Sequence, residues 1–247
     1  MVFWRRIMSE CEPRGLRSGQ ASAVLPPWPR ALAVIAHPDD ESFGLGAVID
    51  RLIAAGGAVD ILCFTHGAAS TLNQAHADLH RVRETELRRA ASELGAASVT
   101  LLDYPDGGLA SIPAAELAGH VAAVAGRAGA SGLLVFDDTG ITGHPDHRAA
   151  TSAAVAAGNR IGLPVLAWTL PTVVAARLSA DTGQDFAGQP PALIDLRVHV
   201  SRERQRRAAL LHASQVSPGA VLWRRLWLLG DYEYLRWLVP PEAAVAR

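Results

Sequence analysis

The chain has 247 residues, of which 49% are hydrophobic and 19% charged, so a sizeable core is possible and a disordered chain is excluded. Its 23 basic and 24 acidic side chains give a net charge of −1, which argues against nucleic acid or an anionic membrane as a partner. Every basic side chain is an arginine, and the absence of lysine excludes Schiff-base and phosphate-loop lysine chemistry.

The cysteine content and the apolar segments indicate a cytoplasmic protein. Cys11 and Cys63 are too few for a four-cysteine zinc site, an iron–sulfur cluster or a disulfide scaffold. The start of the chain lacks the unbroken apolar stretch of a secretory signal. The most apolar region, residues 162–178, is interrupted by prolines, so we expect no integral membrane segment.

The elements expected along the chain alternate between strands and helices. Residues 1–30 mix Arg, Ser, Gly and Pro without periodicity and are expected to form a flexible tail. Short apolar runs predict strands at 31–36, 59–65, 98–102, 133–136, 165–169 and 192–198. Helical spacing predicts helices at 46–55, 77–94, 114–128, 147–157 and around 201–212. This alternation favours a single α/β domain over residues 31–247, with a mostly parallel sheet covered by helices on both faces.

Two of the strand ends carry unusual groups of histidine and acid. The first strand is followed by His37-Pro38-Asp39-Asp40-Glu41, and the fourth by Gly143-His144-Pro145-Asp146-His147. In an open parallel sheet, ligands bind beyond the carboxyl ends of the strands, so both groups are expected at one crevice.

The residue types in these two groups predict a mononuclear metal site. Two neutral imidazoles and one carboxylate, from His37, His147 and Asp40, are good ligands for a borderline divalent ion. Three protein ligands leave a position open for water, as a catalytic site requires. Asp39 is then free to act as the general base beside the metal-bound water.

Two further residues of the second group are assigned supporting roles. His144 precedes His147 by about one helical turn and is expected to stabilise an oxyanion opposite the metal. Asp146 is expected to orient an imidazole. Acidic residues at a helix start are also favoured by N-capping and the helix dipole alone. Histidines beside the acids at two separate strand ends favour the metal site over this simpler interpretation.

Together these motifs resemble the LmbE-like family of N-deacetylases, which includes the PIG-L glycolipid deacetylases and the mycothiol-pathway deacetylases. Three weaker matches support the two strong ones. They are Arg83-Glu84-Thr85-Glu86, Tyr104-Pro105-Asp106-Gly107, and the His-x-Ser-Gln signature His212-Ala213-Ser214-Gln215. The resemblance covers about residues 31–215.

The resemblance implies a Rossmann-like fold and zinc-dependent removal of an N-acetyl group, usually from a glucosamine unit of a small glycoconjugate. It implies that zinc is held by His37, Asp40 and His147, that Asp39 is base and then acid, that His144 stabilises the oxyanion, and that Arg83 and Asp106 contact the sugar. One position departs from the family, because Thr142 stands where some members carry a tyrosine.

Other functions and metals stay open at this point. His37 and His147 with one carboxylate also satisfy the pattern of the iron oxygenases, although the βα alternation argues against that class. Ferrous iron is accordingly a second candidate metal. A sugar-binding module without turnover is a non-enzymatic alternative. The aglycone and the acyl group are not readable from the sequence, and a homo-oligomer is possible.

Histidines outside the two motifs are weaker candidates. His76 and His80 have helical i,i+4 spacing that suits a metal pair, but an Arg/Glu-rich helix favours solvated side chains. His66, at the end of the second strand, is a candidate for the lining of the pocket.

Overall fold

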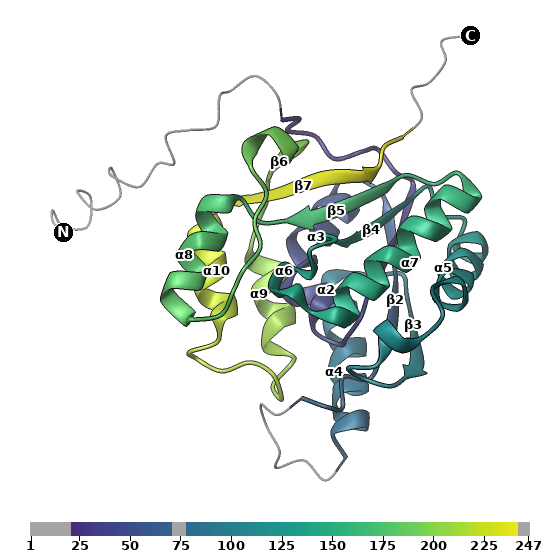
Figure 1. The fold of residues 1–247 in the computed structure, drawn as a ribbon, viewed down its shortest axis with the longest axis horizontal. Helices are drawn as coiled ribbons and strands as arrows, with labels where there is room; N and C mark the ends of the chain where they lie inside the picture. The colour runs from purple at the N-terminus through teal and green to yellow at the C-terminus, as the bar shows by residue number, and fades with distance from the viewer. Residues whose placement is uncertain (1–20, 71–77, 242–247) are drawn as a thin grey trace, which may run out of the picture.

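The computed structural model describes residues 21–70 and 78–241, and a seven-stranded sheet runs through this part of the chain (Figure 1). The strand order is β3-β2-β1-β4-β5-β7-β6. The strands are β1 (Arg30–Ile35), β2 (Ala58–Thr65), β3 (Ser98–Tyr104), β4 (Gly132–Phe136), β5 (Val165–Thr169), β6 (Leu196–His199) and β7 (Tyr232–Val239). The first five pair in parallel, whereas β7 is antiparallel to both β5 and β6. The predicted α/β fold with a mostly parallel sheet is confirmed.

Helices cover both faces of this sheet. The principal helices are α3 (Gly46–Ala54), α4 (Leu79–Leu94), α5 (Ala114–Ala128), α7 (Pro145–Ile161), α8 (Thr172–Thr182), α9 (Glu203–Leu210) and α10 (Val221–Leu229). Apolar residues of α5 and α7 share one core cluster, and those of α3, α4 and α8 share a second with single residues of α9 and α10. The other buried apolar residues of α9 and α10 form a third, smaller cluster. Figure 1 shows α5 and α7 side by side, away from α8 and α10.

Strand β1 shows why the sheet must be buried on both sides. Ala31, Ala33 and Ile35 face the α3/α4 core, and the residues between them face the α5/α7 core. Such a strand reads as a continuous apolar run, which is typical of parallel sheets covered by helices.

The N-terminal lead-in differs from the expected flexible tail. Leu25 and Trp28 are buried, and the Trp28 ring lies so close over β4 that a Cβ on Gly132 would meet it at 2.1 Å. Trp28 also contacts Trp237 edge to face, with ring centroids 6.0 Å apart. The expectation is therefore wrong for the segment around Trp28, while residues 1–20 lie outside the described residues.

The C-terminal third contains elements that the sequence did not reveal. Helices α8 and α10 and strand β7 are additional to the predicted set, and the strand expected at 192–198 begins only at Leu196. Strand β7 carries Glu233, whose side chain is fully buried. Its carboxylate pairs with Arg202 and accepts a hydrogen bond from Trp168, and these contacts compensate for its burial. A charged residue inside a strand hides the apolar pattern on which the prediction depends.

This topology brings the two motif-bearing segments together. His37 follows β1, Asp106 follows β3, and residues 140–147 follow β4, all at the carboxyl edge of the parallel part of the sheet. Among the helices of the described ranges, none combines the length and apolarity needed to cross a membrane.

Candidate active site

A cavity of about 730 Å³ opens at the carboxyl ends of β1, β3 and β4. Seven of the eight predicted site residues line it: His37, Asp39, Asp40, Arg83, Asp106, His144 and His147. The eighth, Asp146, is fully buried behind this wall.

The three predicted metal ligands converge on one point. Asp40 begins the short helix α2 (Asp40–Phe43), and its Oδ2 accepts the backbone N–H groups of Ala36 at 3.1 Å and His37 at 2.9 Å. Its Oδ1 lies 3.1 Å from His147 Nε2, and His37 Nδ1 lies 3.8 Å from Asp40 Oδ2. All three ligand atoms fall within 4.8 Å of one another, which lets them share an ion.

Each imidazole of this set is held by its second nitrogen, as is usual for metal-ligating histidines. His147 Nδ1 lies 3.3 Å from the carbonyl oxygen of Gly140. His37 Nε2 lies 3.2 Å from Asp146 Oδ2 and 3.0 Å from Asp106 Oδ1. Asp146 therefore occupies a position from which it can orient His37.

A second group, His37, His144 and Asp146, also has ligand atoms within 4.8 Å. The oxygens of Asp146, however, already accept the backbone N–H groups of Gly107 at 2.7 Å and Leu109 at 3.1 Å. Asp40 keeps Oδ1 free of backbone donors and borders the cavity, so the set with Asp40 and His147 fits a cation better.

The charge balance of the site also suits a divalent cation. Burial lowers the pKa of His37, but hydrogen bonds to Asp106 and Asp146 and the charge of Asp40 outweigh it and raise this pKa to about 10. Burial likewise lowers the pKa of His147, and the charge of Asp40 more than reverses the effect. The carboxylates thus draw protons onto both imidazoles, and a metal ion would replace those protons.

Asp39 stands beside the ligand set without belonging to it. Its φ of 110° is unusual for a residue other than glycine, and its Oδ2 accepts a hydrogen bond from Arg83 at 2.9 Å. Burial raises the pKa of Asp39 to about 6 against the opposing charge of Arg83. A carboxylate with a pKa near neutrality is suited to general acid–base work.

Arg83 does more than its predicted sugar contact would require. It is buried, and its guanidinium donates to the carbonyl oxygens of Gly67 at 2.5 Å and of Pro38, in addition to Asp39. It therefore ties the loop after β1 to the loop after β2. The predicted sugar contacts of Arg83 and Asp106 stay predictions.

A buried hydrogen-bond network lies behind Asp39. This network was not predicted from the sequence, although its residues lie in motifs identified there. Glu41 accepts the backbone N–H of Asp39 at 3.0 Å, and its other oxygen contacts His212 Nε2 at 2.6 Å. Glu86 accepts both the N–H and the hydroxyl of Ser214, at 2.8 and 2.6 Å. The acid after Asp40 in the first motif was the available signal for this network.

His144 is oriented by the helix that it begins. It is the N-cap of α7, and its Nδ1 accepts the backbone N–H of Asp146 at 3.2 Å. Burial, together with the charges of His147 and His37, lowers the pKa of His144, which favours the neutral imidazole. A neutral imidazole that accepts through Nδ1 carries its proton on Nε2 and is a donor there.

The remainder of the wall is largely apolar and was not anticipated. Its members come from α2, the ends of β4 and β5, and the segments around α8 and α10: Phe43, Phe136, Trp168, Phe186 and Leu222. Thr142 also lines the cavity, and no tyrosine is among its described lining residues.

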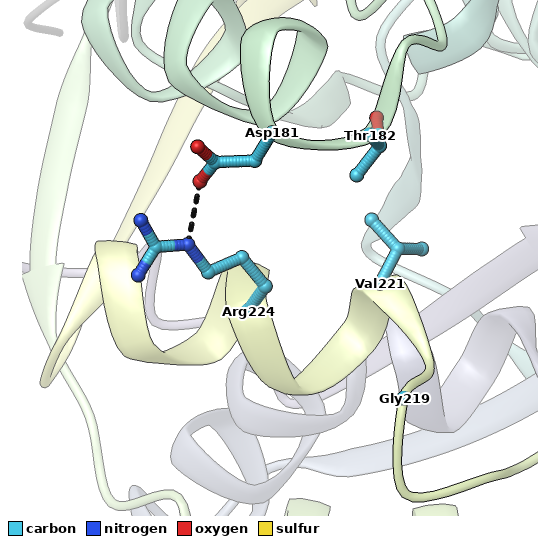
Figure 2. A pocket seen from close by; sticks show the side chains of 5 residues that line it. All are labelled: Asp181, Thr182, Gly219, Val221 and Arg224. Carbon is cyan, nitrogen blue, oxygen red and sulfur yellow. Dashed lines mark hydrogen bonds and ion pairs between the residues drawn. The ribbon is translucent and has the colours of Figure 1, made fainter.

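A second cavity, of about 670 Å³, adjoins the first between α8 and α10, and Gly219 and Val221 border both. Figure 2 shows Asp181 facing Arg224 across it, with the carboxylate 2.7 Å from Arg224 Nε. This cavity holds no group of metal-ligating side chains among its described residues.

His80 is exposed on α4, as its Arg/Glu-rich surroundings indicate, whereas His66 lies away from the pocket for which it was a candidate. His66 is absent from the described cavity lining and instead stacks on His80, with ring centroids 3.4 Å apart, and contacts Asp103 at 2.9 Å. The candidate role of His66 in the pocket lining is therefore not supported, because the end of β2 turns His66 toward α4 and β3. His76, which has i,i+4 spacing with His80, lies outside the described residues.

Comparisons with known proteins identify relatives of this chain. Residues 32–158 match the family model PIG-L, described as GlcNAc-PI de-N-acetylase. The chain is 31% identical to the 1D-myo-inositol 2-acetamido-2-deoxy-alpha-D-glucopyranoside deacetylase of Nakamurella multipartita, over 78% of this chain and 82% of that protein. It is 35% identical to a probable N-acetylglucosaminyl-phosphatidylinositol de-N-acetylase of Schizosaccharomyces pombe, over half of each chain.

A solved structure shares the fold. The N,N'-diacetylchitobiose deacetylase of Pyrococcus horikoshii superposes with a TM-score of 0.64 at 19% identity, over 97% of this chain and 92% of that chain. Given the family match over half of the sequence and the similarity to the Nakamurella deacetylase, the chain belongs to the PIG-L family of de-N-acetylases.

Proposed function

We propose that this chain is a metal-dependent hydrolase that removes the N-acetyl, or another N-acyl, group from an N-acetylglucosamine-containing conjugate. The observation that carries the proposal is the position of Asp39, a carboxylate with a raised pKa that lies beside the His37–Asp40–His147 set and outside it. The names of the relatives support the substrate class, since two of them are deacetylases of glucosamine-containing compounds.

When bound, a zinc ion supplies a Lewis acid for the amide carbonyl and lowers the pKa of water. Asp39 accepts the proton of the attacking water and later returns it to the departing amine, which leaves acetate and a free amino sugar. Arg83 holds Oδ2 of Asp39 and so fixes the direction of this proton transfer. His144 donates from Nε2 to the oxyanion that develops on the carbonyl oxygen.

The donor set supports zinc first and ferrous iron second. Two imidazole nitrogens and one carboxylate oxygen suit both ions, and the site leaves positions open on the cavity side. Membership in a deacetylase family and the mostly parallel sheet favour hydrolysis over the oxygenase chemistry that the same donors serve elsewhere. Retention of all the groups that the chemistry needs argues against a sugar-binding module without turnover.

The test is an assay of metal-loaded protein against a panel of N-acetylglucosamine conjugates with inositol, sugar and lipid aglycones. We expect acetate and primary amine to appear in equal amounts from at least one of them, and activity to disappear on chelation and return with added zinc or iron. The proposal fails if the folded, metal-loaded protein releases no acetate from any conjugate. Iron-dependent oxygen consumption would favour the oxygenase alternative.

A further inference from the structure

Three metal-ligating side chains gather at the ends of β2 and β3, away from the cavity that holds Asp39. His66 follows β2, His80 lies in the first turn of α4, and Asp103 lies near the end of β3. Their ligand atoms fall within 4.8 Å of one another. His37, Asp40, Asp146 and the other members of the catalytic groups take no part in this cluster.

The donor atoms of the cluster lie close enough to one another to share an ion. Asp103 Oδ1 lies 2.9 Å from His66 Nε2 and 4.0 Å from His80 Nε2. Ligands of a tetrahedral zinc ion with bonds of 2.0–2.1 Å are separated by about 3.4 Å, and the two observed distances bracket that value. His66 is buried, while His80 and Asp103 are exposed. Because the His66 and His80 rings stack with 11° between their planes, the exposed His80 ring has to turn out of this stack before both imidazole nitrogens point at one ion.

We propose that His66, His80 and Asp103 form a second, peripheral site for a borderline divalent transition-metal ion such as Zn²⁺. A set of two imidazoles and one carboxylate favours zinc over calcium or magnesium, because calcium and magnesium prefer oxygen ligands. The exposure of Asp103 leaves the remaining coordination positions to water.

An ion at this site would join two segments that border the catalytic cavity. Ala69 lies three residues after His66, and Asp106 lies three residues after Asp103; the N–H of Ala69 donates to Asp106 Oδ2 at 2.8 Å. Both residues line the cavity. The peripheral ion therefore acts as a clip on the loops after β2 and β3, and its binding does not depend on which reaction the cavity carries out.

Metal content separates the two sites. Tag-free protein is stripped with a chelator, titrated with Zn²⁺ and analysed for bound zinc after dialysis. His37 is common to the two groups of possible ligands at the catalytic cavity, one with Asp40 and His147 and one with His144 and Asp146. His37→Ala therefore removes a ligand from both groups, whereas His80→Ala removes a ligand of the peripheral site. His199→Ala, at an exposed histidine of β6, is the matched control.

We expect two zinc ions per chain in the wild type and in His199→Ala, one in each of the other single variants, and none in His37→Ala/His80→Ala. Asp103→Asn should behave as His80→Ala does, and circular dichroism should show that both variants are folded. The proposal is overturned if folded His80→Ala binds as much zinc as the wild type, or if His37→Ala binds none.

Discussion

At the scale of single residues, the adjacent aspartates Asp39 and Asp40 lie in different environments. One carboxylate oxygen of Asp40 accepts two backbone N–H groups and the other contacts His147. Asp39 instead accepts a hydrogen bond from Arg83. Burial favours the neutral acid in both, but the charge of His147 and its hydrogen bond hold the pKa of Asp40 well below its usual range. Asp40 is thereby suited to bind a cation and Asp39 to exchange a proton.

Asp39→Asn should retain its metal and lose most of its turnover. An amide cannot accept the proton of the attacking water, so kcat should fall by about 100-fold or more. Zinc content and kcat measured on the same preparation check this, with Asp40→Asn as the variant expected to lose the metal instead. Retention of most activity in Asp39→Asn would remove the general-base role.

Gly67→Ala should lower activity by displacing Arg83. Gly67 has φ 64°, and a Cβ there would lie 1.9 Å from Arg83 Nη1. Gly129→Ala is the matched control, since Gly129 has φ 66° and open space around the position of its Cβ. We expect the positive φ to lower the free energy of unfolding of both variants. Only Gly67→Ala should show a lower kcat, and it should retain its zinc. Equal kcat in the two variants would contradict the role of Arg83.

The metal-free protein should become less stable as the pH rises above neutrality. The pKa of His37 is raised from 6.5 to about 10 in the folded state. Its contribution is therefore complete below pH 6.5 and is lost as the pH rises toward 10. Urea unfolding of chelator-treated protein between pH 6.5 and 9.5 measures this slope, and His37→Gln should flatten it. The same slope in both proteins would contradict the assignment.

At the scale of elements, buried polar pairs hold the site together from behind. His212 follows α9 and meets Glu41 of α2, and Ser214 meets Glu86 of α4, so the late signature motif joins two helices instead of lining the cavity with these side chains. The hydrogen bond from the Asp39 N–H to Glu41 connects these contacts between helices to Asp39, the proposed general base.

His212→Ala should be strongly destabilising, because it leaves the fully buried Glu41 carboxylate without its imidazole partner. Loss of one member of a buried ion pair costs about 3–5 kcal/mol. Ser214→Ala should cost less, about 1–3 kcal/mol, since its backbone N–H still donates to Glu86. Urea unfolding of the two variants checks the order; a smaller loss for His212→Ala than for Ser214→Ala would be inconsistent with these contacts between helices.

At the scale of the whole molecule, the parallel strands β1 to β5 and part of β6 were predictable from the sequence, whereas the antiparallel strand β7 was not. Strands such as β1 are apolar on both faces, and polar motifs at their carboxyl ends pointed to one crevice. Glu233 and Arg202 form a buried pair. Because charged residues usually indicate an exposed segment, neither strand β7 nor the burial of Arg202 in the arginine-rich segment could be predicted. The partners of Arg83 and Glu41 depend on distances between loops, which spacing along the chain does not encode.

The most direct test is an anomalous difference map at the zinc edge from crystals of zinc-loaded His80→Ala protein, in which the peripheral cluster lacks one ligand. The account predicts one strong peak at bonding distance, about 2.0–2.2 Å, from His37 Nδ1, an oxygen of Asp40 and His147 Nε2, with the Asp39 carboxylate nearby and unbonded. A peak bonded to His144 and Asp146, or coordination of the ion by Asp39 itself, would contradict it.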